Sequence, residues 1–412
     1  MYTLPNKPLR PVLAALLLST LGPAAIAQNM DALEARLLEH PTLNAMRYDS
    51  DALRERAQAA TGLPDPVISF GVNNFPVFDP SFDTFLPTNK AISVRQQFPN
   101  KAGREARSEE VQQRTVQNDA AIDMRFAELR AALQIALIEK RRIETQRMLA
   151  EEREAKYTEL EDIVQTEIDA GRPVVFRLAE IDIERAEVAI VLAELQGQLS
   201  QVEAQLINLV GLVPETAAPV ISALDWKGDA QAFHLVRVSE KAIDVADAGV
   251  DKAKADFRPN WGAQLTYQQR DEGNGAPGST FAGDDWVSGA VTFTIPLWAD
   301  SRQAPALRAA QADREAARAR YLAATRTASV QYATYNAKRR AAEENIAVFQ
   351  QKIDAIADQV AAQLTTYESG VGDYSPIIDG EIASIAFRAQ IALEQSRRDI
   401  AIARMNALLV SQ

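Results

Sequence analysis

Two long stretches of this sequence lack the residues that usually end a helix. Residues 104–168 contain neither glycine nor proline, and residues 301–369 contain only Pro305, which falls in what would be the first helical turn. The first stretch also carries an apolar stripe with a spacing of three or four residues, formed by Ile122, Phe126, Leu129, Leu133 and Leu137. We therefore predict two helices, over 103–168 and 301–369, each roughly 100 Å long. Helices of this length need partner helices along their whole length, so the predicted class is mainly α with coiled-coil-like packing.

Two windows of different composition, residues 66–98 and 261–298, interrupt the helical sequence. Together they hold eight of the fourteen phenylalanines and three of the four tryptophans. Each window contains two segments rich in aromatic and β-branched residues, separated by a stretch with the residues typical of turns. The windows predict two β-hairpins, which add a small β part of four strands to the chain.

The hairpins and helices belong to an internal repeat. Gly171 and Gly370 are 199 residues apart, and so are Glu180 and Asp379. Each half of the chain has the order helix, hairpin, long helix, glycine break, helix. The predicted first repeat covers 28–215 with a glycine break at 169–173, and the predicted second repeat covers 216–412 with a break at 370–376.

The lengths of the shorter helices predict where the glycine breaks lie. A helix at about 31–62 and one at about 173–210, stacked end to end, would match the first long helix in length. Helices at about 234–257 and 376–410 would match the second long helix in the same way. Both glycine breaks would then lie at the tip of the molecule farthest from the hairpins.

Four strands in one chain cannot close into a barrel. An open sheet with exposed edges is an aggregation hazard in water, and its unpaired N–H and C=O groups are not tolerated in a bilayer. Three chains would supply twelve strands and close the sheet. The strands therefore predict an oligomer.

The N-terminus and the charge give further bounds. Lys7 and Arg10 precede an apolar run, and small residues precede Gln28, so residues 1–27 are predicted to be a cleaved signal peptide. The net charge of −12 would become about −14 without that segment, which argues against nucleic acid as a partner. The sequence has no cysteine, which excludes disulfides, thiolate metal sites and a cysteine-linked lipid.

The order of these elements resembles a known family. The doubled repeat and the segments "LPDPVISFGVNNF" and "GRPVVFRLAEIDIERAE" are similar to the TolC-type outer-membrane efflux proteins. The sequence is most similar to the CzcC-like branch found with heavy-metal pumps, through His40-Pro41-x-Leu43, Pro64-x-Pro66 and Asn74-Phe75. It departs from that branch in having "PNKAGRE" after the second strand and in lacking the N-terminal cysteine that many relatives acylate. The resemblance covers nearly all of the chain after residue 27.

This resemblance implies an architecture and partners. The implied protein is a homotrimer, with a 12-stranded β-barrel in the outer membrane and a long α-helical barrel that extends into the periplasm. It would serve as the exit duct for a periplasmic adaptor (a membrane fusion protein) and an inner-membrane RND pump, and heavy-metal cations would be its substrates. We expect no enzymatic activity and no cofactor, because the sequence lacks a nucleophile–base constellation, GxxxxGK[ST] and CxxC.

The resemblance also suggests functional residues, each with a simpler structural interpretation. The family narrows its channel with acidic residues near the tip, which makes Asp379, Glu180 and Asp373 candidates for a periplasmic gate; alternatively they are solvated helix charges. Candidate adaptor contacts at the tips, which could be simple helix caps, are Gly171, Arg172, Gly370, Gly372 and Tyr374. Candidate membrane-interface aromatics, which could instead be hairpin core, are Phe75, Phe78, Trp286, Phe293 and Trp298.

Other interpretations remain open at the level of sequence. His40 and His234 are the only histidines; both precede or begin short helices, so we expect structural roles and no resident metal site.

The same fold could serve drug efflux or type I polypeptide secretion. A periplasmic adaptor also has a long helical hairpin, but its β domains would flank one hairpin instead of recurring in a repeat. An exported structural coiled coil is a further alternative, against which the two aromatic hairpins argue.

Overall fold

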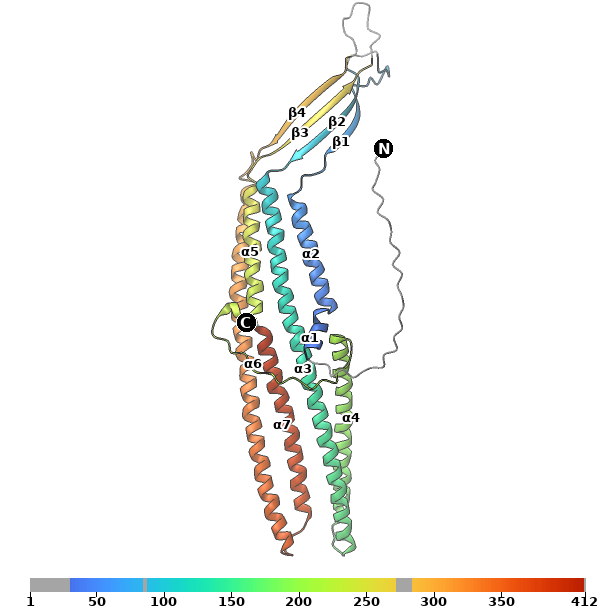
Figure 1. The fold of residues 1–412 in the computed structure, drawn as a ribbon, viewed down its shortest axis with the longest axis vertical. Helices are drawn as coiled ribbons and strands as arrows, with labels where there is room; N and C mark the ends of the chain where they lie inside the picture. The colour runs from blue at the N-terminus through green and yellow to red at the C-terminus, as the bar shows by residue number, and fades with distance from the viewer. Residues whose placement is uncertain (1–29, 84–86, 272–283, 411–412) are drawn as a thin grey trace, which may run out of the picture.

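The structure is a computed structural model that describes residues 30–83, 87–271 and 284–410. It is an elongated molecule with a four-stranded sheet at one end and long helices below it (Figure 1). The predicted signal peptide, residues 1–27, lies outside the described residues. The helices are α1 Met30–Leu38, α2 Pro41–Thr61, α3 Lys101–Asp169, α4 Phe176–Val210, α5 His234–Ala255, α6 Gln303–Glu368 and α7 Ser375–Leu408, with a 3-10 turn η1 at Ala230–Ala232. The strands are β1 Val67–Asn73, β2 Asn89–Phe98, β3 Asn260–Gln269 and β4 Trp286–Thr294.

The two long helices are confirmed. α3 begins after Asn100, whose side chain accepts a hydrogen bond from the Gly103 N–H at 2.6 Å and so caps the helix. Asn260, at the start of β3, accepts from both the backbone and the side-chain N–H groups of Asn100, at 2.7 and 3.0 Å. This joint fixes the start of the first long helix against the second hairpin.

The short helices pack in pairs along the long ones. α2 and α4 both contact α3, one above the other, while α5 and α7 contact α6 in the same way (Figure 1). α5 and α7 also contact α3, so α3 lies at the centre of the chain's helical layer. The helix–helix turns lie at the end of the molecule opposite the sheet, as the lengths predicted.

The prediction of one helix over 31–62 is wrong. The chain forms α1 and α2 instead, with a break at His40, whose backbone is extended (φ −58°, ψ 134°). Pro41 causes the break, because a proline disfavours helical geometry in the residue before it and itself suits the first helical position. The His40 Nδ1 accepts a hydrogen bond from the Thr42 N–H at 3.2 Å, so the histidine caps α2.

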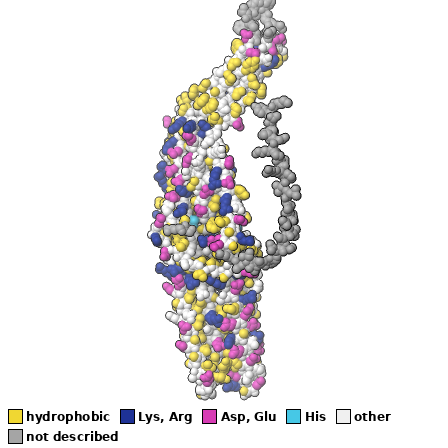
Figure 2. Space-filling model, viewed as in Figure 1, with side chains coloured by type: hydrophobic (Ala, Val, Ile, Leu, Met, Phe, Trp, Pro, Cys, Tyr) yellow, Lys and Arg dark blue, Asp and Glu magenta, His cyan; other side chains and the backbone are white. Residues whose placement is uncertain are grey.

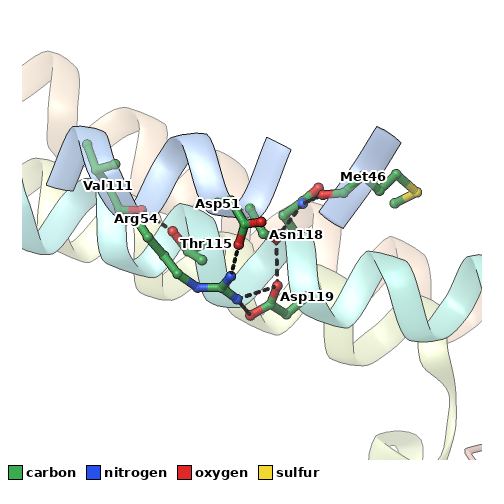
Figure 3. A network of polar contacts seen from close by, with 8 residues as sticks. Met46, Asp51, Arg54, Val111, Thr115, Asn118 and Asp119 are labelled. Carbon is green, nitrogen blue, oxygen red and sulfur yellow. Dashed lines mark hydrogen bonds and ion pairs between the residues drawn. The ribbon is translucent and has the colours of Figure 1, made fainter. Parts of the chain in front are cut away.

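A polar network holds α2 against α3 (Figure 3). Arg54 of α2 forms ion pairs with Asp51, at 2.6 Å, and with Asp119 of α3, at 3.2 Å. The buried Ser50 hydroxyl donates to Asp119 at 2.6 Å, and the Asn118 amide donates to Ser50 Oγ at 2.8 Å. Because these groups must meet their partners, the network sets the register between the two helices.

Three apolar clusters form the core along the helices. The first, at mid-length, includes Leu133, Leu137 and Leu206; the second, near the tips, includes Leu160, Val188 and Ile378. The third includes Phe233 and Met405 and lies beside the segment that joins α4 to η1 and crosses the helices at mid-length. Within the described residues, no helix has the length and apolar character needed to cross a membrane.

The two hairpins form one antiparallel sheet in the order β1-β2-β3-β4. The central pairing joins the two repeats, with Val94 opposite Leu265 and Ile92 opposite Tyr267. β1 and β4 are the two edge strands and have a neighbour on one side only. The sheet of a single chain is therefore open at both edges.

The two faces of the sheet differ in chemistry. Residues alternate between faces along a strand, and directly paired residues share a face, so the register assigns every strand position. One face carries exposed apolar side chains: Ile68, Phe70, Val72, Ile92, Val94, Leu265, Tyr267, Val287, Val291 and Phe293. The other carries mostly small and polar side chains, among them Ser69, Ser93, Arg95, Gln264, Thr266, Ser288 and Thr292. Figure 2 shows the band of hydrophobic side chains over the sheet, in contrast to the mixed surface of the helices.

Candidate functional site

The two helix tips are built by the same local motif. Gly171 and Gly370 both adopt left-handed backbone conformations, with φ of 83° and 77°. At the first tip the Gly171 N–H donates to Ile168 O at 2.8 Å and the Arg172 N–H to Glu167 O at 3.0 Å. At the second tip, the N–H group of residue 370 donates to the carbonyl of residue 367 at 2.9 Å, and the N–H group of residue 371 donates to the carbonyl of residue 366 at 3.3 Å. This pair of bonds around a left-handed glycine is the Schellman motif, and it ends both long helices.

Ion pairs join the first tip to the second. The Arg172 guanidinium lies 2.6 Å from Asp373 Oδ1, and the Arg177 guanidinium lies 3.1 Å from Asp379 Oδ2. Arg172 and Arg177 belong to the α3–α4 turn and to α4, whereas Asp373 and Asp379 belong to the α6–α7 turn and to α7. The cations thus come from one repeat and the anions from the other, so the tips of the two repeats attract each other.

A cavity of about 530 Å³ lies behind these pairs, between the end of α3 and the α6–α7 turn. Its lining includes Glu159, Asp162 and Glu167 of α3, together with two tyrosines. Those tyrosines, Tyr367 and Tyr374, pack edge to face with ring centroids 5.1 Å apart. The tip therefore combines an acidic wall with an aromatic one.

Above the tip, further polar contacts tie α3 to α4 and α7. The Lys156 ammonium lies 2.7 Å from the Glu381 carboxylate of α7 and 2.9 Å from the Glu159 carboxylate of its own helix. Hydrogen bonds to these two carboxylates raise the pKa of Lys156 above the usual value for lysine. The Tyr157 hydroxyl donates to Glu184 of α4 at 2.7 Å. Burial, helped by the Glu184 carboxylate, raises the pKa of Tyr157 to about 12, so the hydroxyl keeps its proton at neutral pH.

The structure brings two of the three predicted gate acids into ion pairs. Asp379 and Asp373 each form an ion pair with an arginine of the other repeat. Glu180, on the exposed side of α4, has no ion pair within the described part of the chain. Of the predicted adaptor contacts, Arg172 and Tyr374 take part in the contacts just described, and Gly372 lines the cavity beside them.

Sequence reasoning missed Arg177. Its partner Asp379 is 202 residues away along the chain. In the first repeat, the position equivalent to Asp379 is held by another acid, Glu180 of α4. A charge comparison of the two tips could have indicated it, because "GRPVVFR" carries two arginines and "GVGDYSPIIDGE" carries only acids. The pairing itself depends on how α4 and α7 are rotated, which no local pattern gives.

The predicted interface aromatics take different positions. Phe293 lies on the apolar face of the sheet, opposite Trp261. Trp286 differs, because its register places it on the opposite face, where the Arg270 guanidinium lies 3.6 Å above its ring. The other three lie in connections. Phe75 and Phe78 follow β1, with Phe75 packed against Phe82, and Trp298 follows β4 and is exposed.

The second histidine is buried at the start of α5. Burial lowers the pKa of His234 below its usual value, while the nearby Asp123 carboxylate opposes that shift. Among the residues that the structure describes, no three His, Asp or Glu side chains are grouped closely enough to hold a metal ion.

Comparison with known proteins shows what the second half of the chain is similar to. Residues 231–410 match the family described as Outer membrane efflux protein. This match covers the second repeat from η1 to the end of α7 and therefore includes the second hairpin and the second tip. No curated protein sequence matches the chain.

Solved structures share the fold along almost the whole chain. CusC matches with a TM-score of 0.75 at 16% identity, over 94% of this chain and 93% of that one. VceC from Vibrio cholerae matches with a TM-score of 0.71 at 15% identity, over 92% of this chain and 95% of that one. The open state of the MtrE outer membrane channel of Neisseria gonorrhoeae matches with a TM-score of 0.70 at 16% identity, over 92% of this chain and 88% of that one. Residues 231–410 are therefore similar to the outer membrane efflux protein family, and the chain as a whole shares the fold of these solved structures.

Proposed function

We propose that three copies of this chain form the outer-membrane exit duct of a tripartite efflux system. The observation that carries the proposal is the sheet, which has one apolar face, one polar face and two unpaired edges. In a trimer, β4 of each chain would pair with β1 of the next, and twelve strands would leave no edge. The apolar face would then contact lipid and the polar face would line a water-filled lumen, which is the alternation of outer-membrane barrels.

The lengths of three of the four strands agree with this assignment. β2 and β3 have ten residues each and β4 has nine. Tilted strands of about 9–11 residues cross the hydrocarbon layer of a bilayer. The helices, more than 60 residues long in α3 and α6, would extend from that layer into the periplasm.

The mass of the purified complex tests this proposal. The expected result is a detergent-stable assembly of three 45.2 kDa chains, less the signal peptide, in the outer-membrane fraction. A monomer released from membranes by salt would contradict the trimer and favour an exported structural rod.

At the tips, we propose the periplasmic gate and the adaptor contact. The Arg172–Asp373 and Arg177–Asp379 pairs would hold the tips of the two repeats together in the closed state, and Glu180 would add an exposed acid beside them. The turns around Gly171 and Gly370, including Gly372 and Tyr374, would face the adaptor. A photo-crosslinker at Val371, which is 83% exposed at the second tip, should capture the adaptor in cells. A crosslinker at Leu322, exposed on the upper half of α6, is the matched control and should not.

For the substrate, we propose heavy-metal cations, on the motifs shared with the CzcC-like branch. Fold likeness does not separate metal from drug export, because the matches to CusC and OprN, with TM-scores of 0.75 and 0.74 at 16% identity each, show the fold alone. Deleting the gene should sensitise cells to at least one divalent or monovalent metal ion more than to dyes or detergents. New dye sensitivity with unchanged metal tolerance would favour a drug-efflux duct, and a secretion defect would favour a polypeptide duct.

A further inference from the structure

A second cavity, of about 470 Å³, lies where the sheet meets the helices. It is formed by the first turns of α3, the connection from α5 to β3 and the connection from β4 to α6. Three arginines line it, Arg107, Arg258 and Arg302, and one carboxylate, Asp256. All three arginines are exposed, and none has an ion pair within the described residues. The cavity thus offers unpaired cations and a net charge of about +2 from three arginines and one aspartate.

Exposed apolar side chains line the same cavity. Ile295, Leu297 and Trp298 follow directly after β4 and are 58%, 75% and 77% exposed. Figure 2 shows Lys and Arg side chains gathered at the top of the helices, directly below the hydrophobic band of the sheet. Apolar surface next to unpaired guanidinium groups suits an amphipathic ligand that has an anionic head and a hydrocarbon body.

The position along the molecule identifies the kind of ligand. The apolar face of the sheet ends with Phe293, and the arginines come just beyond it on the helical side. If the sheet crosses the hydrocarbon layer, this level is the headgroup layer of the periplasmic leaflet, where lipid phosphates lie. Tryptophan favours that interface, and clustered Lys and Arg recognise lipid headgroups.

We propose that this cavity binds the phosphodiester of a glycerophospholipid in the periplasmic leaflet. Arg107, Arg258 and Arg302 would contact the phosphate, since a guanidinium group presents paired N–H donors to phosphate oxygens. Leu297 and Trp298 would contact the start of the acyl chains. The net positive charge favours headgroups with a net negative charge, such as phosphatidylglycerol, over phosphatidylcholine. This inference rests on the proposed membrane-spanning trimer.

The test is native mass spectrometry of the full trimer in mild detergent with added phosphatidylglycerol. The wild-type trimer should retain about three phosphatidylglycerol molecules. In the variant Arg107→Gln/Arg258→Gln/Arg302→Gln, the amount of lipid retained should fall at least five-fold, because an Arg-to-phosphate contact is a strong charge-assisted bond. The matched control is Arg320→Gln/Arg326→Gln/Arg340→Gln. These arginines lie exposed on α6 without an ion pair in the described part of the chain, and the control makes the same change in charge. It should retain lipid as the wild type does.

Further arms separate lipid from free phosphate. Phosphatidylcholine should be retained less than phosphatidylglycerol, and a large excess of inorganic phosphate should leave the bound lipid in place. Displacement by phosphate, or equal lipid retention by the two triple variants, would overturn the inference while the trimer mass and membrane fraction still support an outer-membrane duct. A wild-type protein that is neither trimeric nor membrane-bound would overturn the proposed function and this inference with it.

Discussion

The sheet end and the tip end of the molecule are stabilised by opposite kinds of contact. At the sheet end, continuous backbone ladders join four strands, yet the edges and one apolar face are left without partners in a single chain. At the tip end, the turns are complete within one chain, and exposed or half-exposed ion pairs join the tips of the two repeats beyond an apolar core that Leu160, Val188 and Ile378 supply. The sheet end therefore demands partners outside the chain, whereas the contacts at the tip end are complete within one chain.

Magnitudes support this contrast. Unpaired backbone groups cost several kcal/mol each in hydrocarbon, so an open sheet edge cannot persist in a membrane. An ion pair with solvent access contributes about 1 kcal/mol or less. One end of the chain thus carries a strong requirement for assembly, and the ion pairs at the other end add only a weak restraint, which suits the proposed duct with its proposed gate at the far end.

The largest expected effect is at the sheet. Val291→Arg would place a charge near the middle of the apolar face, where a barrel loses about 2–4 kcal/mol per chain. Its neighbour Ala290 lies on the polar face, and Ala290→Arg would put the same charge into the lumen. We expect Val291→Arg to abolish trimers in the outer-membrane fraction and Ala290→Arg to leave them intact, as measured by the mass of the extracted complex. Equal behaviour of the two variants would contradict the assignment of the faces.

The sheet end was the more predictable from sequence. Glycine-free runs and aromatic windows are local signals, so they gave the long helices and the hairpins within a few residues. The face of each strand position was less certain, because alternation is partial until the pairing register is known. Trp286 is an example, since only its pairing with Gln268 shows that it lies on the polar face of the sheet.

The tip was predictable in its backbone and not in its contacts. The glycines predicted turns because the left-handed conformation at Gly171 and Gly370 favours that residue. The break at His40 is predictable in principle, because Pro41 disfavours helical geometry in the residue before it. The partner of Asp379 was missed because side-chain pairing between segments 202 residues apart depends on the rotation of packed helices.

A smaller effect is expected at the turn itself. Gly370→Ala would force a side chain into the left-handed region, at a cost of about 1–2 kcal/mol. We expect amide hydrogen exchange to become roughly five- to thirty-fold faster at the second tip, with no change in the sheet.

The control for this variant is Gly289→Ala in β4. An added methyl group there meets no atom within 4 Å and the backbone is not left-handed, so exchange should be unchanged. Faster exchange in the sheet of Gly370→Ala would show that the two ends are energetically coupled and would break the contrast.

Opening of the tip should respond to the loss of one cation. Arg177→Gln removes the partner of Asp379 while leaving the helices intact, and the pair contributes about 1 kcal/mol or less per chain. We expect the open-to-closed ratio in planar bilayers to rise by no more than roughly five-fold per chain. Arg326→Gln, which removes an exposed α6 arginine far from the tip, should not change it. A ratio that is unchanged in Arg177→Gln would mean that other contacts hold the gate.

The smallest effect concerns ion selectivity, and it decides whether Asp379 acts as a free charge. Asp379→Asn removes one negative charge per chain and leaves Arg177 without its partner, so each trimer would gain three positive charges at the tip. At physiological salt, charges within about 8 Å of the path of an ion are only partly screened, so the preference for cations should fall. The double variant Asp379→Asn/Arg177→Gln has the same net charge as the wild type.

If the carboxylate is neutralised by Arg177, the double variant should show the wild-type ratio of cation to anion permeability, as measured by reversal potentials in a KCl gradient. A double variant that matches Asp379→Asn instead would mean that Asp379 acts on ions independently of its arginine. In either case the trimer should remain intact, because neither side chain belongs to the apolar core beneath the tips, which Leu160, Val188 and Ile378 supply.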